Sequence, residues 1–170
     1  QKAAHNLRGM HAERILLVID EANGTPEAIF ESIPNQRKGC QNHESIIIGN
    51  PYSHLDTHGQ CATPKDGWMS VTEDLQEWPT KGVDKWQIEP GMCLRYDGGS
   101  SPNVKSNEDK WPFLYTTSDW KRACDVTNEK TLAYWSQDRG LWPPDGFLHT
   151  VITESMLNKH DPEGNLPFRW

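Results

Sequence analysis

Two short apolar runs dominate the first third of the chain. Residues 15–19 are ILLVI and residues 46–48 are III, and neither run alternates with polar positions. Continuous runs of β-branched and other apolar residues are typical of strands in a parallel sheet whose two faces are both covered. We therefore expect two central strands that are buried on both faces and parallel in one sheet, either adjacent or separated by one strand.

The segment between these runs has the pattern of a helix. Thr25 is a candidate N-cap, Pro26 suits the first helical position, and apolar residues follow at helical spacing over 27–33, up to Pro34. A strand, a helix and a second strand make a βαβ unit, in which the two strands are parallel. The first part of the chain therefore predicts an α/β fold.

The pattern weakens after Pro51. It predicts short helices at 53–61, 118–123, 129–136 and 151–157, and short strands at 68–71 and 92–96. Residues 72–112 hold many Pro- and Gly-containing turns, which indicate a loop-rich extension. The polar residues 158–165 predict a linker, so the chain divides into a folded part, 1–157, and a linker, 158–170.

Composition and charge exclude several classes of protein. The chain has 170 residues, about one domain, and only 35% of them are apolar. No window approaches the roughly 18 consecutive apolar residues of a transmembrane helix. The formal net charge is -7, which excludes a uniformly basic nucleic-acid coat but not a motor that contacts DNA through a small local patch.

The histidines and cysteines raise the question of a metal site. His54, His58 and Cys61 have the spacing H-x3-H-x2-C, with Cys40 and His43 upstream, and zinc uses such ligands. Polar loop residues near a turn would give the same pattern. The four cysteines are too far apart in sequence for a disulfide scaffold, so we expect reduced thiols. A non-enzymatic, zinc-stapled binding module remains an alternative.

Polar residues follow both apolar runs. Asp20 and Glu21 come directly after the first run, in a Walker B pattern, and Asn50 follows the second. The carboxyl ends of parallel strands line the ligand crevice of an α/β sheet. An Asp there can hold the Mg²⁺ that bridges the β- and γ-phosphates of ATP, and a Glu can deprotonate the attacking water. An Asn can register the γ-phosphate. The alternative is a pair of polar strand ends.

Six short phrases, taken in order, resemble the large subunit of the tailed-phage terminase, the ATPase that drives genome packaging. They are LRGMHAE at 7–13, LVIDEANGTPE at 17–27, IIGNP at 47–51, GW at 67–68, SPN at 101–103 and DRGLWPP at 138–144. The resemblance covers residues 7–157. It implies the later part of an ASCE-type P-loop ATPase domain, with a mostly parallel sheet and flanking helices. The chain has no G-x-x-x-x-G-K-[ST] loop, so this Walker A loop would lie upstream, and an RNase H-like nuclease would follow Trp170.

The resemblance also implies roles for individual residues. Asp20 would be the magnesium-coordinating Walker B residue, Glu21 the catalytic carboxylate, and Asn50 part of the coupling motif at the nucleotide. Arg8 stands where related motors carry an arginine that acts on a neighbour's ATP, although a solvated surface arginine is the alternative. Arg139 matches a family phrase, and we expect it to be a structural tether.

At the level of the whole protein, the resemblance implies ATP hydrolysis that packages double-stranded DNA into procapsids. The implied partners are double-stranded DNA, the portal protein, a small terminase subunit and further copies of the chain, with no membrane. The implied location is the host cytoplasm, with transient docking on the viral procapsid. We expect the isolated chain to be inactive, because it lacks the phosphate-binding loop. A helicase-like P-loop motor is the alternative, but it would not predict the phrases SPN and RGLWPP.

The chain is also rich in tryptophan, with 8 in all. Exposed tryptophans stack on bases or sugars. Most of these residues neighbour Pro or Gly in the loop-rich half, and we expect them to pack in small cores.

Overall fold

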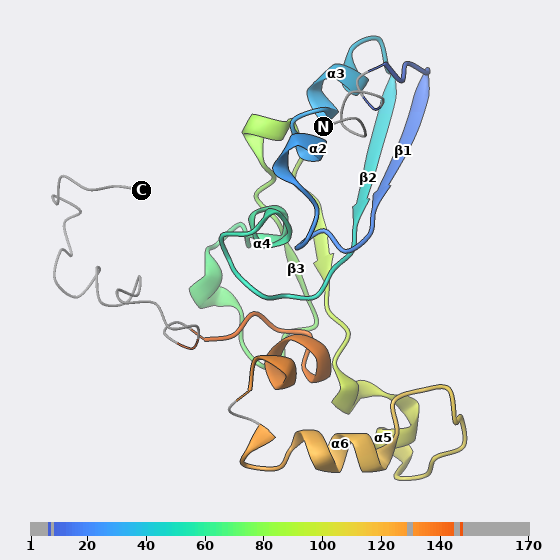
Figure 1. The fold of residues 1–170 in the computed structure, drawn as a ribbon, viewed down its shortest axis with the longest axis vertical. Helices are drawn as coiled ribbons and strands as arrows, with labels where there is room; N and C mark the ends of the chain where they lie inside the picture. The colour runs from blue at the N-terminus through green and yellow to red at the C-terminus, as the bar shows by residue number, and fades with distance from the viewer. Residues whose placement is uncertain (1–6, 8, 129–130, 145–146, 148–170) are drawn as a thin grey trace, which may run out of the picture.

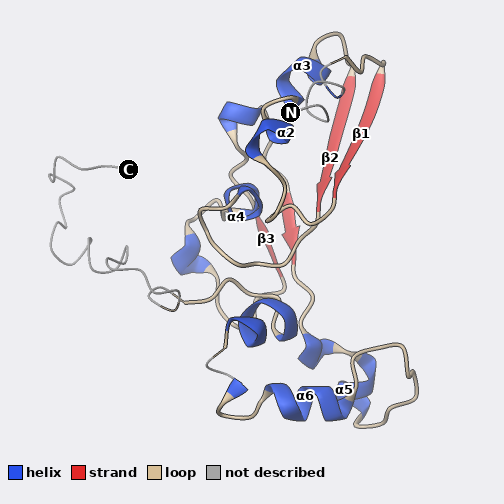
Figure 2. Cartoon of the chain, in the orientation of Figure 1, coloured by secondary structure: helices blue, strands red, loops and turns tan. Residues whose placement is uncertain are grey.

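The computed structural model describes residues 7, 9–128, 131–144 and 147. Within this part the chain is mixed α/β, with two sheets of two strands each, as the sequence predicts at the level of fold class (Figure 1). Long loops connect the short elements (Figure 2). In chain order the elements are β1 (Arg14–Ile19), α2 (Glu27–Phe30), α3 (Ile33–Arg37), β2 (Asn42–Ile47), α4 (Thr57–Ala62), β3 (Glu77–Pro79), β4 (Met92–Leu94), α5 (Pro102–Ser106) and α6 (Thr117–Ala123).

The strands β1 and β2 are adjacent and parallel, as the two apolar runs predict. The register sets Ile19 opposite Ile47. Beyond the strands, the backbone N–H of Ile48 donates to the carbonyl of Ile19 at 2.8 Å, and the N–H of Ala22 donates to the carbonyl of Ile48 at 2.9 Å. The pairing therefore continues into the loops that follow, and both strands end at the same edge of the sheet.

The expectation that both faces of these strands are buried is wrong. Exposure alternates along the strands, and Leu16, Val18, Ile46 and Ile48 are all about half exposed. The physical reason is that α2 and α3 pack on one face only, and no element of the described part covers the other (Figure 1). The strand β2 also begins earlier than its apolar run, because its backbone pairs with the whole length of β1.

The connection between β1 and β2 holds two short helices rather than one. The helix predicted over 27–33 is divided, since α2 ends at Phe30 and α3 begins at Ile33. Pro34, which we expected to end the helix, lies in the first turn of α3. Backbone N–H groups in the first turn of a helix have no partner within the helix, so a proline, which lacks this N–H, is tolerated there.

A first hydrophobic cluster packs these helices on the sheet. Phe30 and Ile33 are 0% exposed and Trp86 is 1% exposed. The rings of Phe30 and Trp86 lie with their centroids 4.7 Å apart. The cluster is completed by Ile19, Ala22, Cys61 and Val83. It therefore joins β1, α2, α3 and α4 to the 3-10 turn Asp84–Trp86.

A second, smaller cluster forms where the antiparallel pair β3–β4 meets the end of α4. Its buried members are Ala62, Trp78 and Trp142. The indole N–H of Trp78 donates to the carbonyl of Ala62 at 2.8 Å, and that of Trp142 donates to the carbonyl of Ser53 at 3.1 Å. These tryptophans, together with Trp86, pack in small cores as expected.

The last part of the described chain contains α5, α6 and a turn of π-helix, Tyr134–Asp138 (Figure 1). Helix α6 begins with a capping box. The Thr116 hydroxyl accepts from the N–H of Asp119 at 3.1 Å, and the Asp119 carboxylate accepts from the N–H of Thr116. The expected helix at 118–123 is therefore confirmed, with its N-cap at Thr116.

Other expected elements have mixed outcomes. The helix expected at 53–61 is α4, and the strand expected at 92–96 is β4. The strand expected at 68–71 is wrong, because Gly67, with φ 82°, turns the chain into the 3-10 turn Trp68–Ser70. The expected helix at 129–136 is described only in part. The expected helix at 151–157 and the linker at 158–170 lie outside the described residues.

The first cluster predicts a large difference between two phenylalanines. Phe30→Ala should lower the free energy of unfolding by about 3–5 kcal/mol, because it opens a cavity in a closed core. Phe113 is 80% exposed, so Phe113→Ala should change it by less than about 0.5 kcal/mol. Urea unfolding followed by circular dichroism measures both. Equal losses in the two variants would contradict the packing described here.

Candidate functional site

The polar residues that follow β1 and β2 lie at one edge of the parallel sheet. Asp20 and Glu21 come directly after β1 and are exposed, whereas Asn50 follows β2 and is half-buried. The hydrogen bond between the N–H of Ala22 and the carbonyl of Ile48 joins the two loops. The parallel pairing therefore places all three predicted residues at the carboxyl edge of the sheet, where α/β proteins bind ligands.

The backbone of the Asp20–Glu21 turn has an unusual conformation. Glu21 has φ 52°, in the left-handed region, which costs a non-glycine residue about 1 kcal/mol. Its N–H donates to Oδ1 of Asp20 at 2.9 Å. Its carbonyl accepts from the N–H of Gly24 at 2.9 Å and from the hydroxyl of Thr25 at 3.2 Å. The sequence predicts Thr25 as the N-cap of the helix that follows, but its hydroxyl stabilises this turn and does not cap α2.

Helix α4 fixes the same turn from the other side. The buried hydroxyl of Thr57, at the start of α4, donates to the carbonyl of Ala22. Asp56 caps α4 by accepting from the N–H of Gly59 at 2.7 Å, and its second oxygen accepts from the N–H of Ser53 at 3.1 Å. Sequence reasoning missed Asp56 and Thr57, although an Asp before a helical segment is a known N-cap signal.

Gly49 brings the two loops into close contact. A Cβ atom at this position would lie 2.9 Å from Oδ1 of Asn23, 3.2 Å from N of Ala22 and 3.3 Å from Nδ1 of His58. Only glycine therefore fits between these loops without a shift. Within the described part of the chain, the Asn23 and His58 atoms are buried and have no hydrogen-bond partner. Such atoms are typical positions for an ordered water.

The surroundings of His58 favour its neutral form. Burial lowers its pKa below the ordinary value, against the opposing effects of the Asn50 backbone and the Asp56 carboxylate. Its ring packs against Trp142, with the centroids 5.0 Å apart. A neutral imidazole beside Asn50 can accept or donate a hydrogen bond there without adding charge.

Asn50 also lines a groove of about 710 Å³, together with His58, Arg95 and Ser136. Asp20 and Glu21 are not among its lining residues. The structure thus brings Asn50 to the groove, and the two carboxylates to the same sheet edge but outside the groove. Sequence reasoning missed Arg95 and Ser136, because no motif marks either residue.

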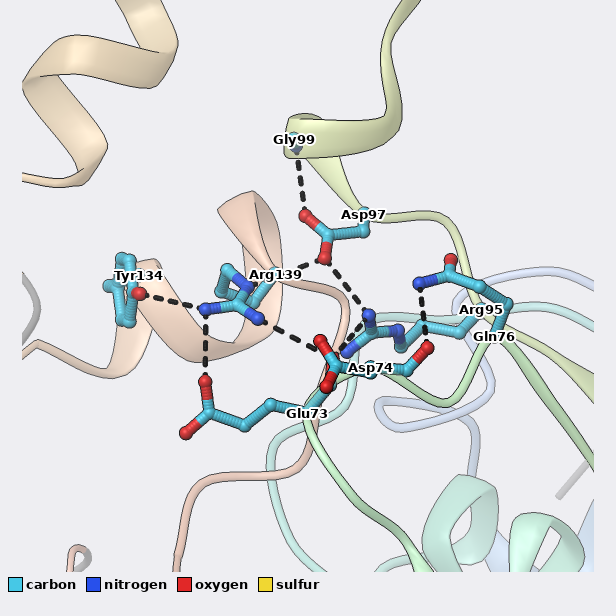
Figure 3. Close-up of polar contacts among 8 residues, drawn as sticks. All are labelled: Glu73, Asp74, Gln76, Arg95, Asp97, Gly99, Tyr134 and Arg139. Carbon is cyan, nitrogen blue, oxygen red and sulfur yellow. Dashed lines mark hydrogen bonds and ion pairs between the residues drawn. The ribbon is translucent and has the colours of Figure 1, made fainter. Parts of the chain in front are cut away.

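A buried ion-pair cluster ties the end of β4 to the last described segments (Figure 3). The side chain of Arg95 is 1% exposed, and its Nη2 donates to Oδ2 of Asp97 at 2.9 Å and to the carbonyl of Glu73 at 2.8 Å. Arg139 donates through Nη1 to the Tyr134 hydroxyl at 3.0 Å and to the Glu73 carboxylate at 3.2 Å. Burial lowers the pKa of Arg95, while Asp97 opposes this change. These contacts make Arg139 a structural tether.

The side chains of the possible zinc site are engaged elsewhere. The ring of His54 stacks on Trp68 at 4.1 Å, and Cys61 lies in the first hydrophobic cluster. Burial raises the pKa of Cys61 to about 12, so its thiol stays protonated at neutral pH. Among the described residues, no group of three His, Cys, Asp or Glu side chains is placed to hold a metal ion. The geometry therefore gives the zinc-stapled alternative no support.

Three other expectations remain. Arg8 lies outside the described residues, so its position relative to the site is not described. The four cysteines are free thiols, as expected. In the part of the chain that the structure describes, no helix has the length and apolar character needed to cross a bilayer.

No family model, curated protein or solved structure matches the chain.

The left-handed conformation of Glu21 predicts an unusual response to glycine. Glu21→Gly should leave the free energy of unfolding unchanged or raise it by up to about 1 kcal/mol, because glycine adopts this conformation without strain. Glu31 is the matched control, since it is also exposed but has φ -61°. Glu31→Gly should lower the free energy of unfolding by about 0.5–1 kcal/mol. If both variants lost stability equally in urea unfolding, the strained turn would be refuted.

The lowered pKa of His58 predicts a loss of stability in mild acid. Below the ordinary histidine pKa of about 6.5, the unfolded chain binds a proton more readily than the folded chain. The free energy of unfolding should therefore fall as the pH drops from 7.5 to 5.5, and His58→Gln should reduce that fall. Burial and Arg37 also lower the pKa of His43, so His43→Gln should further reduce the fall in the free energy of unfolding between pH 7.5 and 5.5. An unchanged pH dependence in the His58 variant would contradict its burial as a neutral ring.

Proposed function

We propose that this chain is the later part of a P-loop ATPase domain in the large subunit of a viral terminase, where ATP hydrolysis drives double-stranded DNA into procapsids. The observation that carries the proposal is the parallel pairing of β1 and β2. It places Asp20, Glu21 and Asn50 at one carboxyl edge of a sheet, as a Walker B strand and a neighbouring sensor strand require. The ordered phrases of the sequence add the resemblance to terminases.

The carboxylates at this edge suit a magnesium ion. Mg²⁺ is usually bound by one or two carboxylates together with phosphate oxygens and water. Oδ1 of Asp20 accepts from the N–H of Glu21, and Oδ2 accepts no hydrogen bond from the described residues. Asp20 therefore has one oxygen available as a ligand. The bound ion would supply positive charge to offset that of the β- and γ-phosphates.

Glu21 and Asn50 would act on the attacking water and on the γ-phosphate. The bonds from Gly24 and Thr25 fix the direction in which Glu21 leaves the sheet. Its carboxylate would orient the water and accept its proton. The Asn50 amide would donate to a phosphate oxygen. Because Gly49 packs against the Ala22 backbone, a displacement at Asn50 would also reach the Glu21 turn, which suits a coupling role.

The triphosphate itself would be held by the preceding sequence of a longer protein. The chain contains no Walker A loop, and that loop supplies the backbone N–H groups and the lysine that hold phosphates. On this proposal the isolated chain does not hydrolyse ATP, and Arg8 acts on the ATP of a neighbouring copy. A nuclease domain would follow the linker that the sequence predicts at 158–170.

The partners follow from the same proposal. They are double-stranded DNA, the portal, a small terminase subunit and further copies of the chain, in the host cytoplasm and transiently on the procapsid. With a net charge of -7, DNA contact would be confined to a local basic patch.

The phrases that favour a terminase over a helicase-like motor have structural roles in this chain. Asn103, in the phrase SPN, is 0% exposed, and its amide side chain bonds the backbone of Trp111 through both its nitrogen and its oxygen. Arg139, in the phrase DRGLWPP, holds Glu73 and Tyr134. Residues of both phrases therefore stabilise the loop-rich extension, and a helicase-like motor would not predict these phrases.

The test is mutation of the sheet edge in the longer protein that carries the preceding sequence. Glu21→Gln should leave nucleotide binding in place and lower single-turnover hydrolysis by about 10²–10⁴-fold, because the amide loses the basicity of the carboxylate. Asp20→Ala should weaken magnesium-dependent binding, and Asn50→Ala should slow hydrolysis or uncouple it from DNA movement. Glu31→Gln, at an exposed position away from this edge, is the control. Wild-type hydrolysis by the Glu21 variant would refute the catalytic assignment.

A further inference from the structure

A second groove, of about 780 Å³, lies between the 3-10 turn Trp68–Ser70 and the segment 141–144. Tryptophan and proline form much of its wall, namely Trp68, Trp135, Trp142, Pro143 and Pro144. None of the predicted ATPase residues lines it. The groove therefore contains none of the sheet-edge residues Asp20, Glu21 and Asn50, although Trp142 also lines the groove that holds Asn50.

The indole N–H groups of Trp68 and Trp135 are available to donate hydrogen bonds to a ligand. The indole N–H of Trp142 is used, since it donates to the carbonyl of Ser53. Trp68 and Trp135 are half-buried, and their indole N–H groups donate no hydrogen bond to any residue in the described ranges. The Trp68 ring is nevertheless fixed, because it stacks on His54 with the centroids 4.1 Å apart. The groove thus combines oriented aromatic faces with unused N–H donors.

The charged residues of the groove are mainly acidic. Asp66 and Glu73 contribute two carboxylates, and Lys81 contributes one ammonium group. Arg139 pairs with one oxygen of Glu73, but the Glu73 side chain is 61% exposed and its second oxygen accepts no bond from the described residues. Lys81 and Arg139 balance these two carboxylates in formal charge, but the exposed oxygens of Asp66 and Glu73 can still accept from a cationic partner, and the overall charge of -7 favours a basic one.

We propose that this groove binds a proline-rich segment in the polyproline II conformation, flanked by arginine or lysine. Proline rings pack on aromatic faces, and a polyproline II segment loses little conformational entropy on binding. Its carbonyls, which form no internal hydrogen bonds, would accept from the indole N–H groups of Trp68 and Trp135. The flanking cations would face Asp66 and Glu73. The aromatic faces, the donors and the acidic rim each match one feature of this partner.

The test uses the 170-residue chain and the synthetic peptide RPLPPLPPR as the probe. Two further peptides separate the contributions: RALAALAAR removes the prolines, and EPLPPLPPE reverses the flanking charge. Titration is followed by the indole N–H resonances in heteronuclear NMR and by calorimetry. We expect saturable shifts of the Trp68 and Trp135 signals with RPLPPLPPR, weaker binding of EPLPPLPPE, and no binding of RALAALAAR. The difference between the two charged peptides should shrink as salt is raised.

Substitutions locate the binding. Trp135→Phe keeps an aromatic ring but removes the N–H donor, and it should weaken RPLPPLPPR binding about fivefold. Trp111→Phe is the matched control, because Trp111 is 41% exposed and lies outside the groove, and it should leave binding unchanged. Asp66→Asn should weaken binding about twofold at low salt and not at high salt. Circular dichroism shows whether each variant is folded. If Trp135→Phe is unfolded, the salt-dependent loss of binding in Asp66→Asn still tests the proposal, because Asp66 is exposed.

Four results would overturn the proposal. They are the absence of any binding, equal binding of RALAALAAR, equal losses in the Trp135 and Trp111 variants, and shifts of the groove signals by adenosine but not by the peptide. The last result would identify the groove as a stacking site for a small planar ligand.

Discussion

The parallel pairing of β1 and β2 is the constraint on which the rest of the structure depends. It brings the loops after both strands to one edge, where the Ala22 N–H bonds the Ile48 carbonyl and Gly49 packs against Ala22. It also turns one face of the strand pair toward α2 and α3, and Phe30 and Ile33 of these helices pack in a hydrophobic core on that face. A shift of the register by one residue would turn the apolar side chains away from these helices and separate the polar loops.

The remainder of the chain is held by small cores and buried polar contacts rather than by regular structure. Trp78 and Trp142 each bury a ring, and each indole N–H donates to a backbone carbonyl, that of Ala62 at the end of α4 and that of Ser53 in a loop. Arg95 and Arg139 tie loops that are distant in sequence through Asp97 and Glu73. A chain with few apolar residues gains little from a large core, so directional contacts to loop backbone carry much of its organisation.

The sequence predicted the parts of the fold that depend on local pattern, and missed those that depend on packing. The continuous apolar run at 15–19 identified β1 and its parallel partner, but not that Val18 would remain exposed, because exposure depends on which elements cover the sheet. The polar strand ends led to Asp20, Glu21 and Asn50. Arg95 gave no signal, since its importance comes from burial beside residues distant in sequence.

The conformation of the Asp20–Glu21 turn shows how the site and the fold are connected. A left-handed glutamate is unfavourable by itself and persists only where its surroundings impose it. Here the N–H of Gly24 and the hydroxyl of Thr25 donate to the carbonyl of Glu21, and the hydroxyl of Thr57 donates to the carbonyl of Ala22. These contacts come from the connection and from α4, and both of these pack in the core that closes over the parallel strands. Hydrophobic burial some residues away therefore stabilises the backbone conformation of Glu21, which sets where this exposed residue leaves the sheet edge.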